Sequence, residues 1–162
     1  MDKQSFSAAE KTLNHVMDVG VQQAVTALST LTQRSVDVHT TSLHFIPVEE
    51  VTAFVGHPVD ITSVVLLELQ GDIPGIVLFL FPEGDARALQ ALMTGAIEQP
   101  EDSERLAQSA LCEVGNILSG ACLSAFADFL NMHISQSTPH LAEDMLGSLM
   151  DGVLAELGTA SD

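Results

Sequence analysis

Basic residues are scarce in this sequence, and their scarcity excludes several classes of partner. The 162 residues contain 5 Lys or Arg against 22 Asp or Glu, which gives a formal net charge of −17. Such a chain is repelled by phosphate backbones and by anionic lipid headgroups, so we expect neither nucleic acid nor a membrane as partner. A phosphorylated protein is compatible with this charge, provided that the partner supplies the cations.

Cysteine is also rare. Cys112 and Cys122 lie on one predicted helix, about 15 Å apart, which is too far for a disulfide. We interpret them as small apolar residues of a protein in a reducing compartment. The first residues, "MDKQSFSAAEK", lack the apolar core of a signal peptide. The sequence therefore predicts a cytoplasmic protein.

No apolar run is long enough to span a membrane. The most apolar stretch, "VVLLELQGDIPGIVLFLF", is interrupted by Gln70, Gly71, Asp72 and Pro74. Two apolar runs joined by such turn residues are typical of a β-hairpin. With 46% hydrophobic and 17% charged residues, the whole chain, 1–162, is expected to form a single globular domain.

The hydrophobic pattern predicts an α+β fold in which a mixed β-sheet is flanked by long helices. Amphipathic spacing and start and stop signals predict helices at 8–31, 84–95, 103–130 and 142–158. Runs rich in β-branched or apolar residues predict strands at 34–48, 61–70, 75–81 and 132–138.

The two long helices resemble each other. The apolar residues Leu13, Val16, Val19 and Ala27 recur 98 positions later as Leu111, Val114, Ile117 and Ala125. This indicates either a pseudo-twofold repeat, with copies at about 8–97 and 103–158, or the chance likeness of two core helices. The second copy lacks an equivalent of the hairpin at 62–81, which would leave a sheet edge exposed. We therefore expect that the chain pairs with a second copy, as a homodimer, or with another partner.

The segment "SALCEVGNILSG" places polar residues inside a predicted helix, although Asn is a poor helix former. At about 100° per residue, Ser109, Glu113 and Asn116 fall on one narrow stripe of the helix. The opposite side carries Leu111, Val114, Leu118, Ala121 and Ala125. Such a stripe is typical of a solvated helix face, and equally of a site presented to a partner.

Gly115 and Gly120 lie near this stripe, and Gly inside a helix costs about 1 kcal/mol relative to Ala. Their presence indicates either close packing of another helix or the close approach of a large partner.

Ser109, Glu113, Asn116 and Pro139 together spell the spacing [DS]-x3-E-x2-N-x22-P. This spacing is similar to the signature of the CheC/CheX/FliY family of chemotaxis response-regulator phosphatases. The segments "AVTALSTLTQRSVDV", "VEEV", "GDIPGIVLFLFPE" and "DMLGSLMDGVLAELG" resemble CheC-type segments in the same order. The resemblance covers about residues 8–158, and it implies a CheC-like fold with the internal repeat.

CheC-type proteins usually carry two sites, one in each repeat. The 98-residue offset places the first of them at His15 and Asp18, where "HVMD" replaces the expected E-x-x-N. The resemblance therefore implies a degenerate first site and one working site, at Glu113 and Asn116. CheX-type members also have a single site, so the site count leaves the subfamily open, whereas the resembling segments favour CheC.

The resemblance also implies a reaction, namely hydrolysis of the aspartyl phosphate of a CheY-type response regulator. Asn116 would orient the attacking water, because a neutral amide does not repel the phosphoryl oxygens. Glu113 would pair with a Lys of the regulator, and Ser109 and Pro139 would support the site. The regulator would carry the Mg²⁺, and this chain would bind no cofactor, since its His and Asp residues lack metal-ligand spacing.

Two alternatives to an enzyme stay open at this point. The first is a binding module that holds a phosphorylated regulator or a CheD-type deamidase without hydrolysis. The second is a structural role at the flagellar switch, although the chain is short for an additional switch domain.

Overall fold

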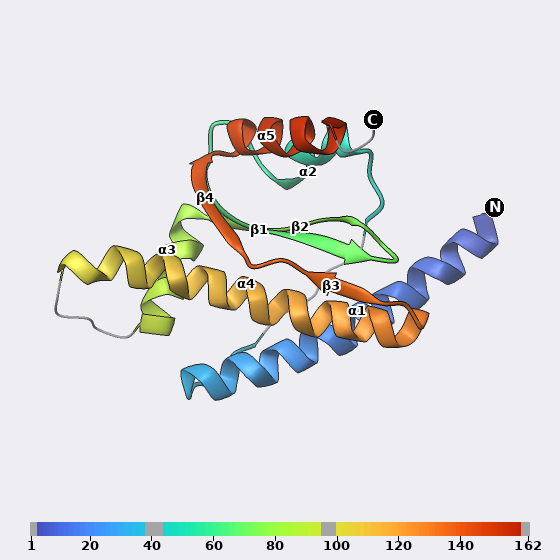
Figure 1. Ribbon diagram of the computed structural model, residues 1–162, viewed down its shortest axis with the longest axis horizontal. Coiled ribbons are helices and arrows are strands. Elements are labelled where there is room, and N and C mark those ends of the chain that lie inside the picture. The colour runs from blue at the N-terminus through green and yellow to red at the C-terminus, as the bar shows by residue number, and fades with distance from the viewer. Residues whose placement is uncertain (1–2, 38–43, 95–99, 160–162) are drawn as a thin grey trace. The chain divides into compact units, whose positions relative to one another are not determined.

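The computed structural model describes residues 3–37, 44–94 and 100–159, which form an α+β fold (Figure 1). Its elements are α1 (Lys3–Thr32), η1 (Val48–Glu50), α2 (Val51–Val55), β1 (Ile61–Gly71), β2 (Gly75–Pro82), α3 (Glu83–Thr94), α4 (Pro100–Leu130), β3 (Ile134–Gln136), β4 (His140–Met145) and α5 (Leu146–Thr159). The predicted fold class, both long helices and the hairpin of β1 and β2 are confirmed.

Strand β1 is the centre of the sheet. It pairs with β2 on one side, and on the other it pairs with β4 through Ile61–Leu66 and with β3 through Leu69–Gly71. The pairs with β3 and β4 are antiparallel. Three residues join β1 to β2, which is far too short for a parallel crossover. The sheet is therefore antiparallel, and the expectation of a mixed sheet was wrong.

The chain divides into two compact units. The described residues of 1–44, 67–77 and 113–139 form the first unit, and those of 45–66, 78–112 and 140–162 form the second unit. Both β1 and α4 run through the two units. The predicted internal repeat follows a different division of the chain and stays a prediction.

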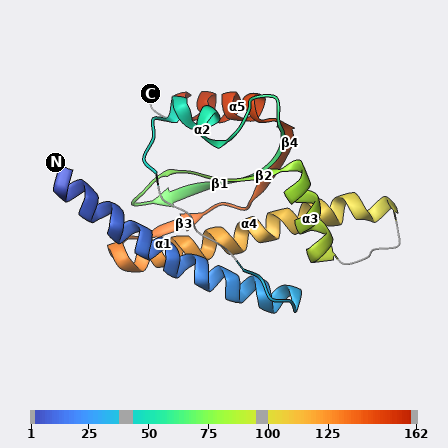
Figure 2. The ribbon, with the colours of Figure 1, turned by 180° about the vertical axis from the view of Figure 1, so that it is seen from behind.

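In the first unit, α1 lies beside the C-terminal half of α4 (Figures 1 and 2). The core of this unit consists of apolar residues on those helices and on β1, namely Val16, Val21, Ala24, Leu28, Leu67, Val114 and Ala125. On each helix these positions fall on one side, which is the amphipathic pattern that predicted the helices, because it places one apolar stripe toward the core.

In the second unit, α5 follows β4 directly and packs against α2. Backbone hydrogen bonds fix the start of α5, from Leu146 N to Asp60 O and from Gly147 N to Pro58 O, both 2.9 Å. The apolar core of this unit comprises Val64, Val65, Ala86, Ala110, Leu111, Leu146, Met150 and Val153.

One predicted helix is confirmed with a later start, and one predicted strand was wrong. The helix expected at 142–158 begins only at Leu146, because Ala142–Met145 belong to β4 and pair with β1. The letters "AEDM" favour a helix locally, and the pairing with β1 overrides that preference. The strand expected at 34–48 is absent from the described residues 34–37 and 44–48, and its middle lies outside the described residues. β-Branched residues favour a strand only where a neighbouring strand pairs with them.

Within the described chain, α4 is the one helix whose length and composition over Glu104–Leu130 would allow a membrane span. Its buried positions Val114, Ser119 and Ala125 belong to a protein core, and Glu113 and Asn116 are exposed near its middle. These features are typical of a core helix with one solvated face, so we assign α4 to the protein core.

Candidate functional site

Glu113 and Asn116 lie in the first unit, near the middle of α4, and both side chains are exposed. Val114, between them in the sequence, is 2% exposed and faces the core. The helix therefore turns its apolar stripe inward and presents the carboxylate and the carboxamide to solvent. The exposure expected from the sequence is confirmed.

The Asn116 amide is held by a chain of two side-chain hydrogen bonds. Gln136 Nε2 donates to Asn116 Oδ1 at 2.8 Å, and Ser119 Oγ donates to Gln136 Oε1 at 2.6 Å. Ser119 lies one helical turn after Asn116 and is 2% exposed, whereas Gln136 is half-buried on β3. The chain of hydrogen bonds thus runs from a buried hydroxyl to an exposed amide.

The position of Gln136 is fixed by β3. Gln136 pairs with Leu69 of β1, and the next residue, Ser137, is bonded to Glu68 twice. Ser137 N donates to Glu68 O at 2.9 Å, and Glu68 N donates to Ser137 Oγ at 3.0 Å. The backbone that carries Gln136 is therefore anchored to a strand whose Leu67 is fully buried.

The two supporting residues predicted from the motif occupy different places. Pro139 is half-buried in the first unit, beyond the end of β3, where its fixed φ limits the chain that follows Gln136. Ser109 is exposed on the segment of α4 that belongs to the second unit, and it takes no part in the hydrogen bonds around Asn116.

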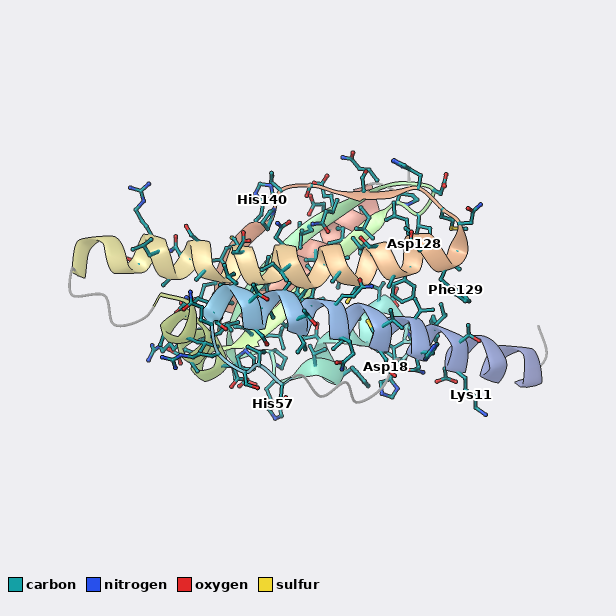
Figure 3. The ribbon with its side chains drawn as sticks, turned by 90° about the horizontal axis from the view of Figure 1, so that it is seen from below. Lys11, Asp18, His57, Asp128, Phe129 and His140 are labelled. Atoms are coloured by element: carbon teal, nitrogen blue, oxygen red, sulfur yellow. The ribbon has the colours of Figure 1, made fainter. Side chains whose placement is uncertain are left out.

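The degenerate first site lies on α1. His15 and Asp18 are both exposed, and neither side chain forms a hydrogen bond or ion pair with any other described residue. Figure 3 shows Asp18 on α1. Over the described ranges no group of three or more His, Cys, Asp or Glu could hold a metal ion. His15 and Asp18 are therefore two solvated side chains.

Glu113 has no cationic partner among the residues that the structure describes. Within the described residues, the ion pair joins Arg87 to Glu83, which lie one turn apart on α3. An exposed carboxylate without a partner keeps its hydration and stays available to a cation that arrives on another molecule.

The cysteines take no part in this site. Cys112 and Cys122 are free thiols, as the sequence predicted, and burial raises the pKa of both. A raised pKa keeps a thiol in its neutral form, which is a poor nucleophile.

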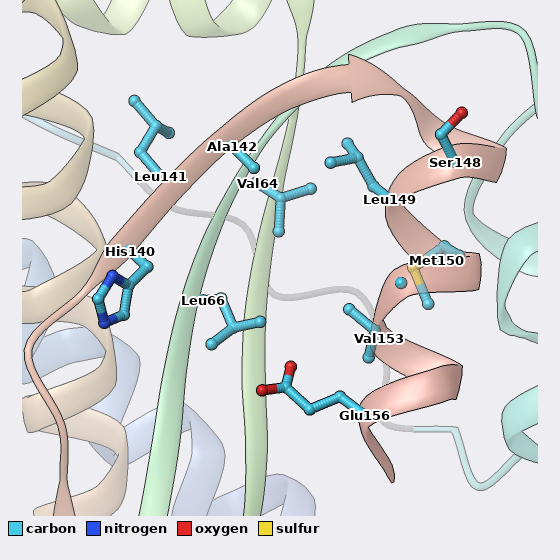
Figure 4. A pocket seen from close by; sticks show the side chains of 11 residues that line it. Val64, Leu66, His140, Leu141, Ala142, Ser148, Leu149, Met150, Val153 and Glu156 are labelled. Carbon is cyan, nitrogen blue, oxygen red and sulfur yellow. The ribbon is translucent and has the colours of Figure 1, made fainter. Parts of the chain in front are cut away.

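A separate hollow lies in the second unit. It is a cavity of about 360 Å³ lined mostly by apolar side chains of β1, β4 and α5, together with His140 and Glu156 (Figure 4). None of the site residues predicted from the sequence lines it.

A sequence profile of the CheC-like family matches residues 106–142, the segment that contains Glu113, Asn116, Gln136 and Pro139. Across a much longer stretch, the chain is 31% identical to CheC1 of Halobacterium salinarum over 149 residues, which cover 87% of this chain and 74% of that protein. The chain belongs to the CheC-like family. It is also 27% identical to the CheY-P phosphatase CheC of Bacillus subtilis over 153 residues, covering 93% of this chain and 73% of that protein.

Solved structures share the fold of this CheC-like chain. FliY of Thermotoga maritima superposes with a TM-score of 0.69 at 17% identity, covering 85% of this chain and 69% of that one. A chemotaxis protein CheX from Desulfovibrio desulfuricans gives a TM-score of 0.54 at 19% identity, covering 81% and 79%. Both agree with the fold that the motif implied.

Two residues of the site were missed from the sequence. Ser119 had a local signal, since it lies three residues after Asn116 and thus on a neighbouring part of the helix face. Gln136 had none, because its position beside Asn116 depends on the pairing of β3 with β1.

Proposed function

We propose that this CheC-like protein is a phosphatase that hydrolyses the aspartyl phosphate of a CheY-type response regulator in chemotaxis signalling. The main support is the exposure of Glu113 and Asn116 on one face of α4, at the family's motif spacing. The relative from Bacillus subtilis is named a CheY-P phosphatase, which supports the same substrate.

The reaction needs an oriented water more than it needs a nucleophile from this chain, because an acyl phosphate is already activated. The water oxygen attacks phosphorus, the bond from phosphorus to the regulator's Asp oxygen breaks, and inorganic phosphate and a free carboxylate result. The water passes one proton to a phosphoryl oxygen and keeps the other, so that the released product is dihydrogen phosphate. Catalysis of this kind depends mainly on positioning and charge stabilisation.

Asn116 is the residue that would position the water. Its Oδ1 accepts a hydrogen bond from Gln136 and keeps a second lone pair, which can accept from the water. Its Nδ2 donates to no other described residue, so it can donate to a phosphoryl oxygen. A carboxylate in the same place would repel the phosphoryl group, and this is why Asp18 does not suit the reaction.

Glu113 would bind the regulator rather than act on phosphorus. An anion beside a phosphoryl group is unfavourable unless a cation lies between them. Glu113 lacks such a cation within the described chain, so the proposal assigns it a Lys of the regulator. The ion pair would set the register in which Asn116 meets the phosphoryl group.

The regulator would bring its own Mg²⁺, and this chain would supply no cofactor. We place the protein in the cytoplasm, because its two cysteines are free and its partner is a signalling protein. A CheD-type partner and a homodimer are further proposals from the sequence resemblance and from the expected sheet edge, and a binding assay and light scattering would test them.

The deciding experiment measures single-turnover loss of the phosphoryl group from a radiolabelled CheY-type regulator in the presence of Mg²⁺. We expect Asn116→Ala to slow the catalysed loss by about 100-fold, as removal of a transition-state hydrogen bond does elsewhere. Binding to the regulator held in its beryllofluoride form should stay within about twofold, because Glu113 is retained. Gln108→Ala, which removes an exposed amide elsewhere on α4, is the matched control and should have no effect.

Three results would decide between the enzyme and its alternatives. Turnover that depends on Asn116 supports the phosphatase. Binding of the phosphorylated form with no acceleration of phosphate loss identifies a binding module. Wild-type turnover in Asn116→Ala means that the site has been placed wrongly.

A further inference from the structure

We propose that Gln136 is a positioning residue, which holds the Asn116 amide in the orientation that the phosphatase reaction needs. The proposal rests on the proposed function for its link to turnover, but the contact itself is independent of that function. The observation that supports it is the chain of hydrogen bonds from Ser119 through Gln136 to Asn116.

An exposed Asn on a helix is poorly suited to orienting a water by itself. The torsion that turns its amide plane has a broad energy profile, so the oxygen and the nitrogen exchange places easily. An amide that must be ordered at the moment of reaction adds its conformational entropy to the barrier. A partner that orders Asn116 beforehand removes that cost.

Gln136 is placed to do this. Its Nε2 donates to Asn116 Oδ1 at 2.8 Å, which selects the orientation that leaves Nδ2 free for a visiting group. Its own orientation is selected in turn by Ser119 Oγ, which donates to Gln136 Oε1 at 2.6 Å. Because Ser119 is 2% exposed, water competes poorly for that hydroxyl.

The hydrogen bond from Gln136 also makes the Nδ2 of Asn116 a stronger donor. When Oδ1 accepts a hydrogen bond, the amide is polarised, and its N–H groups become better donors. The Nδ2 of Asn116 would then bind a phosphoryl oxygen more strongly in the presence of Gln136. Both effects act on the reacting complex, so they predict a change in kcat and little change in KM.

The register of the sheet indicates that this contact is more than a chance meeting of two surface amides. Gln136 pairs with Leu69 of β1, while its neighbour Ser137 is bonded twice to Glu68. The Cα of Gln136 is therefore fixed, and the side chain reaches α4 from a rigid element. A residue on a loop would have a less fixed backbone and would hold Asn116 less firmly in one orientation.

The test uses Gln136→Met, which keeps the length of the side chain and removes both hydrogen bonds. We expect kcat for a phosphorylated CheY-type regulator to fall about tenfold, with KM within about twofold of wild type. Ser119→Ala should lower kcat about threefold, because Gln136 keeps its bond to Asn116 and loses its anchor. Gln70→Met is the matched control, since Gln70 is exposed on β1 opposite Ser135, and it should leave both constants unchanged.

A double-mutant cycle separates a chain of contacts from general damage to the fold. If Ser119 acts through Gln136, adding Ser119→Ala to Gln136→Met should lower kcat no further. Losses that multiply would show two independent effects and would overturn the relay. Gln136→Met should lower the thermal midpoint, because the buried Ser119 hydroxyl loses its acceptor, so kcat is compared at a temperature at which every variant is folded. A kcat loss that disappears at such a temperature would count against positioning.

A measurement without substrate tests the contact independently of turnover. In ¹H–¹⁵N spectra, the side-chain NH₂ of Asn116 should show an ordered signal in wild type and in Gln70→Met, and fast averaging in Gln136→Met. An Asn116 amide equally ordered in all three proteins would overturn the inference. If Asn116→Ala retains turnover, the proposed function fails, yet this spectrum still decides whether Gln136 positions Asn116.

Discussion

Gly20 of α1 faces the backbone of Cys122 in α4 so closely that a Cβ at Gly20 would lie 2.7 Å from the Cys122 Cα. The same Cβ would lie 3.3 Å from the Ala121 carbonyl oxygen. The helices of the first unit therefore meet backbone to backbone at this point. The contact places the part of α4 that belongs to the first unit, which includes Glu113 and Asn116, against α1.

We expect Gly20→Ala to destabilise the protein by about 1–3 kcal/mol, since the added methyl meets backbone that cannot move aside. This is opposite to the sign that helix propensity alone predicts, where Ala is better than Gly by about 1 kcal/mol. Gly152→Ala on α5 is the matched control, because no atom lies within 4 Å of the added Cβ. Urea denaturation should show a lower midpoint for the first variant and an equal or higher midpoint for the second, and two higher midpoints would refute the close contact.

Gly120 offers a different prediction, because it also lies inside α4 but a Cβ added there would meet no atom within 4 Å. On the helical wheel it falls about 40° from Asn116, on the face that carries the site. Gly120→Ala should therefore raise the free energy of unfolding by about 1 kcal/mol. If a regulator comes close to this face, the same methyl should weaken binding of its beryllofluoride form several-fold.

Gly152→Ala again supplies the control for Gly120→Ala, with increased stability and unchanged affinity. A Gly120→Ala protein that is more stable and binds the regulator as well as wild type would show that the regulator does not approach Gly120. That result would leave the glycine without a functional explanation.

Glu113→Ala should weaken binding of the phosphorylated regulator about tenfold, or about 1.4 kcal/mol, as loss of one member of an interfacial ion pair does. It should also make the affinity less sensitive to salt, because an attraction between charges has been removed. Isothermal titration at low and moderate ionic strength measures both effects. Glu104→Ala, which removes an exposed carboxylate nine residues earlier on α4, should change neither quantity.

The exposure of Glu113 and Asn116 was predictable because it depends only on helical periodicity. Once the apolar residues of α4 face the core, the position of every other residue on the helix is determined. The same periodicity predicted α1. The hairpin of β1 and β2 was predictable from its turn residues, which lie within a short stretch of sequence.

What could not be predicted depends on pairing between distant segments. The letters "AEDM" allow a helix or a strand, and only the pairing of β4 with β1 decides between them. Gln136 becomes a neighbour of Asn116 because β3 pairs with β1 at Leu69, and no local pattern specifies that register. The contact between Gln136 and Asn116 could therefore not be predicted from the sequence.

The degenerate first site on α1, at His15 and Asp18, should be catalytically inactive. Asp18 is exposed and sets a negative charge where the reaction needs a neutral amide, so Asp18→Ala should leave turnover within about twofold of wild type. The sharper measurement adds Asp18→Ala to Asn116→Ala, in which the proposed working site is disabled. The residual turnover should be the same with and without Asp18, because a degenerate site contributes nothing. A further drop in the double variant would mean that α1 carries a second active site, and that one of the two sites works without the carboxamide on which the proposed mechanism depends.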